Sequence, residues 1–161
     1  MAQANSAVPA LPEAEGEVCI PINASEQIEF CYARGWTDGL PVVPASRTLV
    51  AEMLEAGNLK PEAVIAEMPS RKVAVTAEKI AINAVMAGCK PEYMPVVTAA
   101  VKALAAPEFG LHHVASALSG PTIVILVNGP IAQRLGINAT NNLFGPGIAV
   151  RACPAFGEPC R

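Results

Sequence analysis

The sequence predicts an α/β fold, with a small mixed or parallel sheet packed with several helices in a single domain. One observation is the run at 122–127, which is rich in β-branched residues, the pattern of a strand covered on both faces. Another is the turn Asn128-Gly129-Pro130 directly after it, where Pro130 suits the first turn of a helix that ends at Gly136. A strand, a turn and a helix in this order form an α/β unit.

The first two helices are expected from cap residues. Asn23 followed by Glu26 resembles a capping box, and apolar residues then recur at helical spacing until Gly35 supplies a stop. Ser46 can cap a second helix, which the Gly-Asn pair at 57–58 closes. Both helices are therefore predicted to precede any strand.

Two short strands and a third helix follow. Residues 63–66 and 73–75 favour strands, and Thr76 can cap a helix over 77–87. Because this helix has almost no polar face, we expect it to be central and buried. Pro95 then suits the first turn of another helix.

The domain boundaries follow from composition. Residues 1–20 lack periodicity and are predicted to form a mobile arm. The α/β domain is assigned to 21–147, and a flexible tail at 148–161 carries two cysteines.

The composition excludes some functions. Of the 161 residues, 52% are hydrophobic and 16% charged, so part of the surface is expected to meet another protein. A net charge of −3 without a Lys/Arg cluster argues against nucleic-acid binding. The first residues lack a signal-peptide pattern, so we expect a cytoplasmic protein, in which five cysteines at irregular spacing do not indicate a disulfide framework.

A loop with glycines and prolines presents the first candidate site residues. Trp36, Thr37 and Asp38 lie where side chains are presented for binding. The alternative is that Asp38 only caps the turn while Trp36 covers the edge of the core.

Three further candidates lie at helix and strand ends. Asn83 is expected to be a buried amide, which costs about 1–3 kcal/mol without a partner, supplied by a substrate or by a backbone loop. Cys89 follows a helix end and is either a reactive thiol or a small core residue. Asn128 lies in the expected crevice of the sheet, where it contacts a ligand or caps the helix.

The remaining cysteines and the histidines do not predict a metal site. His112 and His113 are adjacent, and in a strand they would face opposite sides. Cys153 and Cys160 lack zinc-ribbon spacing, although they could pair on oxidation. No cofactor follows from the sequence.

Three stretches resemble the motifs of a largely uncharacterised bacterial family. They are Gly-Trp-Thr-Asp-Gly-Leu-Pro-Val-Val-Pro at 35–44, Ala-Ile-Asn-Ala-Val-Met-Ala-Gly-Cys-Lys-Pro-Glu-Tyr at 81–93, and Asn-Gly-Pro at 128–130 with Leu-Gly-Ile-Asn at 135–138. The resemblance covers 28–147. Such proteins are often encoded beside, or joined to, proteins with a Cys/Sec-Gly-Ser-Cys motif, loosely described as thiol or selenol oxidoreductases.

The resemblance implies a set of site residues and a partner. Its motif positions are Trp36, Thr37, Asp38, Asn83, Cys89, Glu92, Tyr93, Asn128 and Asn138. Among these, Cys89 would react or relay electrons, Asp38 or Glu92 would move protons, and the others would bind a small-molecule substrate. This chain departs from the family pattern at Ile148, which predicts a site completed by a second polypeptide, such as the Cys/Sec-Gly-Ser-Cys protein.

Two functions remain open. The first is a subunit of a multi-chain enzyme with a thiol-dependent redox or lyase-type site, in a hetero-oligomer. The second is a non-catalytic scaffold or binding subunit, in which the motifs only set loop geometry.

Overall fold

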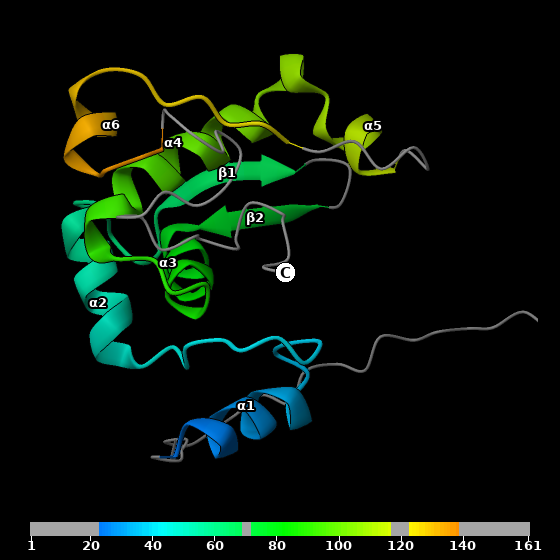
Figure 1. Ribbon diagram of the computed structural model, residues 1–161. Helices are drawn as coiled ribbons and strands as arrows, with labels where there is room; N and C mark the ends of the chain where they lie inside the picture. Colours follow the sequence, from blue (N-terminus) through cyan, green and yellow to red (C-terminus); the bar gives the residue numbers. More distant parts are fainter. Residues whose placement is uncertain (1–22, 69–71, 117–122, 139–161) are drawn as a thin grey trace, which may run out of the picture. The chain divides into compact units, whose positions relative to one another are not determined.

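In the part of the chain that the structure describes, helices and one β-hairpin make up the fold, which confirms the predicted α/β class. The computed structural model describes residues 23–68, 72–116 and 123–138 (Figure 1). The chain divides into two compact units, Met1–Gly39 and Leu40–Arg161, here called the N-terminal unit and the main unit. The predicted arm at 1–20 and tail at 148–161, with Cys153 and Cys160, lie outside the described residues.

The N-terminal unit holds one described helix, α1 (Ala24–Ala33). Asn23 caps it as predicted, because its side-chain oxygen accepts a hydrogen bond from the Ser25 backbone N–H at 3.2 Å. The predicted capping box would place that bond on Glu26, one residue further along. The cap therefore forms, but with a different donor.

The main unit contains a hairpin and the other helices. In chain order these are α2 (Arg47–Ala56), β1 (Val64–Met68), β2 (Val73–Thr76), α3 (Ala77–Met86), the short 3₁₀ helix η2 (Pro91–Tyr93), α4 (Met94–Ala105), a second 3₁₀ helix η3 (Pro107–Phe109), α5 (Leu111–Ser116) and α6 (Pro130–Arg134).

The predicted helix starts in the main unit are confirmed. The Ser46 hydroxyl accepts from the Leu49 N–H at 3.3 Å, and the Thr76 hydroxyl accepts from the Lys79 N–H at 3.4 Å. Each bond satisfies a donor in the first helical turn that has no partner within its helix. Pro95 lies in the first turn of α4, as its missing N–H allows.

The hairpin and three helices enclose the core. β1 and β2 pair antiparallel, with Val64 opposite Thr76 and Met68 opposite Val73. α4 lies against β1, while α3 packs on α2 and α4 (Figure 1). The buried cluster consists of Met53, Leu54, Ala77, Ile80, Ala81, Ala84, Val85, Cys89, Tyr93, Met94, Val97 and Leu135.

The predicted strand at 122–127 is the main correction. Residues 123–128 are neither helix nor strand, and Thr122 lies outside the described residues. Val124 and Leu126 are 59% and 81% exposed, so the segment is not covered on both faces. A β-branched run shows only that extended backbone is favoured; whether it pairs depends on a neighbouring strand.

The segment around the two histidines is a second correction. His112 and His113 lie on α5, so they do not alternate across a strand. Adjacent residues on a helix diverge by about 100°. Their rings contact edge to face with centroids 5.8 Å apart.

Candidate functional site

Two of the sequence motifs meet at the C-terminal end of α3. Gly88 takes the left-handed conformation, with φ +75°, and its N–H donates to the Val85 carbonyl at 2.8 Å. The Cys89 N–H donates to the Ala84 carbonyl at 2.9 Å, which completes a Schellman motif. The Val43 N–H of the extended segment after Gly39 donates to the Met86 carbonyl at 3.0 Å, satisfying another helix-end acceptor.

Cys89 belongs to the core at this helix end. Its side chain is 9% exposed and lies in the buried cluster, as the second residue after a helix commonly does in a Schellman motif. It is disulfide-bonded. The sulfur of Cys89 is therefore oxidised and is not a free thiol, which the irregular spacing of the cysteines did not indicate.

Cys31 is a free thiol on α1 and is fully buried. Burial raises its pKa above the usual value, because desolvation disfavours the thiolate, and the nearby Arg34 charge opposes this only in part. The thiol is therefore kept in its protonated, weakly nucleophilic form.

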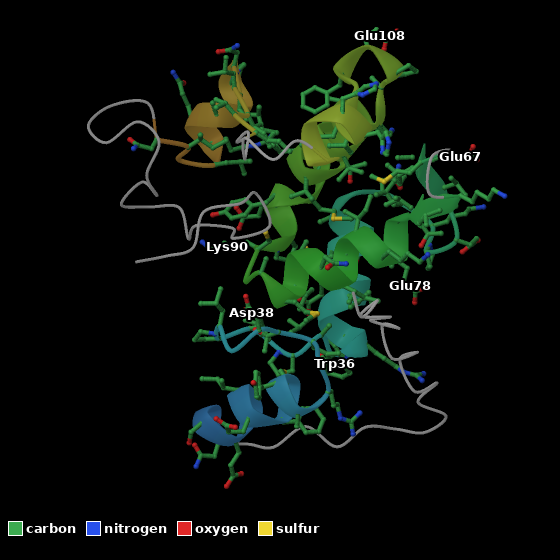
Figure 2. All side chains as sticks on the ribbon, turned by 90° about the vertical axis from the view of Figure 1, so that its right-hand side faces the viewer. Trp36, Asp38, Glu67, Glu78, Lys90 and Glu108 are labelled. Carbon is green, nitrogen blue, oxygen red and sulfur yellow. The ribbon has the colours of Figure 1, made fainter. Side chains whose placement is uncertain are left out.

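The residues that follow Cys89 differ in how far their side chains are exposed to solvent. Lys90 and Glu92 are exposed, and Figure 2 shows the Lys90 side chain extending from the connection between α3 and α4. Tyr93, predicted to bind substrate, is only 7% exposed and packs within the core. Glu92 can therefore meet a solvent-borne molecule, whereas Tyr93 mainly fills space.

Asn83 is a correction to the expected burial. It lies on the exposed side of α3, and its side-chain amide donates to the Lys79 carbonyl at 2.8 Å. Glu78 and Lys79 are exposed on the same helix, and Glu78 extends outward in Figure 2. The helix buries one face instead of being central, because its apolar residues cluster on that side.

The Trp36 loop lies in the N-terminal unit. The Trp36 N–H donates to the Cys31 carbonyl at 3.0 Å, in a Schellman motif with Gly35 at φ +68°. The indole contacts the Phe30 ring edge to face at 5.8 Å, and the Arg34 guanidinium lies 4.4 Å from the centre of the Phe30 ring. Trp36 thus closes the end of α1 and stays 38% exposed.

Thr37 and Asp38 follow Trp36 in this loop. The Gly39 N–H donates to the Thr37 hydroxyl at 3.3 Å, so Thr37 shapes the turn. The Asp38 carboxylate is exposed (Figure 2). Within the described residues it does not cap the turn, since that bond is made by Thr37.

An open apolar groove lies on the main unit between α4 and the segment that leads into α6. Its volume is about 430 Å³, and its walls are Pro95, Val96, Ala99, Ala100, Ala103, Ile125, Leu126, Val127, Asn128 and Ile131. Asn128 is the one predicted site residue in the groove. Because Gly129 is the N-cap of α6, the Asn128 side chain does not cap that helix.

The described residues provide few other features for a site. Asn138 is half-buried after α6. Within 23–68, 72–116 and 123–138, no three or more His, Cys, Asp or Glu side chains gather where they could hold a metal ion. In the same ranges no single helix is long and apolar enough to span a membrane, although the bent pair Pro91–Ala105 and Pro107–His113 passes by length and composition.

Comparison with family models, curated proteins and solved structures found no match. The family resemblance therefore stays a prediction from three sequence motifs. What the structure adds is the place of each motif, with the second motif and the end of the first joined by the Val43–Met86 hydrogen bond.

Sequence reasoning missed most of the groove residues. Ala99 and Ala103 lie on the outer side of α4, a helix whose only charged residue is Lys102. A helix that is apolar on nearly all sides is expected to be covered on all of them. That signal, together with the hydrophobic composition, could have located this exposed apolar surface.

Proposed function

We propose that this protein is an assembly subunit, which binds another polypeptide through the apolar groove beside α4. The groove carries the proposal, because nine of its ten lining residues are apolar and it is open to solvent among the described residues. Exposed apolar surface of this kind typically marks a protein interaction site. The partner would insert apolar side chains between α4 and residues 125–131.

The distribution of the motif residues supports a structural role for several of them. Trp36 and Cys89 occupy the same position after two helix ends, Tyr93 fills the core, and Asn83 bonds to its own helix. Of the predicted site residues, only Asn128 lines the groove. These residues therefore set backbone geometry on which a binding surface is built.

The test is native mass spectrometry of the untagged chain purified from its own cells. A complex with a second polypeptide is expected, and Ala99→Glu is expected to release it, because the new carboxylate lies in the apolar groove. The matched control Ala51→Glu introduces the same charge at an exposed position of α2 and should retain the partner. A chain recovered alone, or a complex that Ala99→Glu leaves intact, contradicts the proposal.

A second candidate is a thiol-dependent subunit of a redox enzyme, which the disulfide at Cys89 favours. Two small-molecule thiols would reduce this disulfide to two protein thiols and leave as one small-molecule disulfide, so that two electrons and two protons pass to the protein. Glu92 lies three residues after Cys89 and is exposed. Of the two carboxylates predicted to transfer protons, it is the one nearer to Cys89 in the sequence.

This candidate is tested by alkylating the protein across a series of glutathione redox buffers and measuring the Cys89 peptide by mass spectrometry. A catalytic disulfide is expected to be half-reduced near about −180 to −270 mV, whereas a structural one resists reduction to below about −300 mV. Resistance throughout the series would leave only the assembly function. The free thiol of Cys31 is the internal control for alkylation of a buried site.

A further inference from the structure

The segment 123–128 is extended and, among the described residues, its backbone is unpaired. It follows an extended course beside α4, as Figure 1 shows, without a strand partner among the described residues. Within those residues its backbone N–H and C=O groups make no hydrogen bond to another element. Such a row of donors and acceptors is a template for pairing with another strand.

The exposure of the side chains alternates along this segment. Ile123, Ile125 and Val127 are half-buried, whereas Val124 and Leu126 are 59% and 81% exposed. This is the period of a strand with one face covered and one face bare. Leu126 is the most exposed of the large hydrophobic residues that the structure describes.

We propose that this segment pairs antiparallel with the same segment of a second copy of the chain, about a two-fold axis at Ile125. This rests on the proposed assembly function and adds a partner to it. The pairing places Val124 against Leu126 of the partner subunit, and both side chains then lie on the same face. Their contact would cover the most exposed apolar atoms, and the backbone groups would satisfy each other.

The charge pattern supports a second copy as the occupant. In a two-fold symmetric contact, residues near the axis face the same residues of the second copy. A charged side chain in this segment would therefore be repelled by the like charge on the second copy. The sequence contains no Asp, Glu, Lys or Arg from Val114 to Gln133, while the whole chain has a net charge of −3. This segment is therefore one along which two copies can approach without like-charge repulsion.

The first test is sedimentation equilibrium of the full chain over about a hundredfold range of concentration. A dimer is expected, and Leu126→Glu should raise its dissociation constant at least about tenfold, because two apolar side chains are lost from each interface. Leu49→Glu is the matched control on α2, where Leu49 is 38% exposed, and should leave the constant unchanged. Val124→Glu is a second variant with the same expected direction.

Hydrogen exchange locates the contact. Amides in 123–127 should become protected as the concentration of the wild-type chain rises, and this protection should be absent in Leu126→Glu. A monomeric wild-type chain, or a dimer whose constant and protection are unaffected by both variants, overturns the pairing. Leu126 also lines the groove, whereas Val124 does not, so Val124→Glu tests the pairing and Ala99→Glu tests the groove. A complex that loses its partner with Ala99→Glu but contains one copy of this chain overturns only the pairing.

Discussion

The ends of α1 and α3 have the same local structure but different surroundings. In each, a glycine with positive φ is followed by a residue whose N–H bonds back five positions, from Trp36 to Cys31 at 3.0 Å and from Cys89 to Ala84 at 2.9 Å. Yet Trp36 is 38% exposed, whereas Cys89 is 9% exposed and part of the core cluster. The same helix stop can therefore present a side chain to solvent or bury it.

The largest expected effect comes from placing a charge at both positions. With reductant present in all samples, Cys89→Asp should lower the free energy of unfolding by about 3 kcal/mol or more, since a carboxylate would be buried without a partner. Trp36→Asp should cost under about 1 kcal/mol, because the new charge stays in water. Urea unfolding followed by circular dichroism measures both. Equal losses would show that the two positions are buried alike.

A smaller effect is expected from the two glycines. Gly88→Ala should lower the free energy of unfolding of the main unit by about 1 kcal/mol, because alanine is strained at φ +75°. Gly35→Ala carries similar strain at φ +68°, but it lies in the other compact unit. It should increase hydrogen exchange in α1 and leave the urea midpoint of the main unit unchanged. A shift of that midpoint would mean that the units unfold together.

The smallest effect is expected at Asn83, between these helix ends. Asn83→Ala should change the free energy of unfolding by no more than about 0.5 kcal/mol, because the amide is exposed and alanine favours the helix. A buried amide with a required partner would instead give a loss of about 1–3 kcal/mol. The same urea titration distinguishes the two values.

The helix starts and stops could be predicted because their causes are local. Asn23, Ser46 and Thr76 each accept a hydrogen bond from the first turn of the helix they precede. The strand predicted at 122–127 did not form, because pairing needs a neighbour that no local pattern specifies. α5 was missed because its six residues lack helical periodicity in the sequence.

The candidate site was predicted less completely than the fold. The motifs at 35–44 and 81–93 are predicted to carry site residues, and a hydrogen bond from Val43 to Met86 joins them. The sequence could not tell that Tyr93 and Cys89 are buried while Asn83 is exposed. Nor could it show that α4 and 125–131 form a groove, because those segments are distant along the chain.

The sequence by itself determined the helix caps and the glycines that end α1 and α3, since each depends on hydrogen bonds and backbone torsions within a few residues. Only the tertiary structure decided which residues after those ends are buried, and which apolar surface remains exposed beside α4. Burial depends on packing between segments far apart in the chain, which local preferences do not specify.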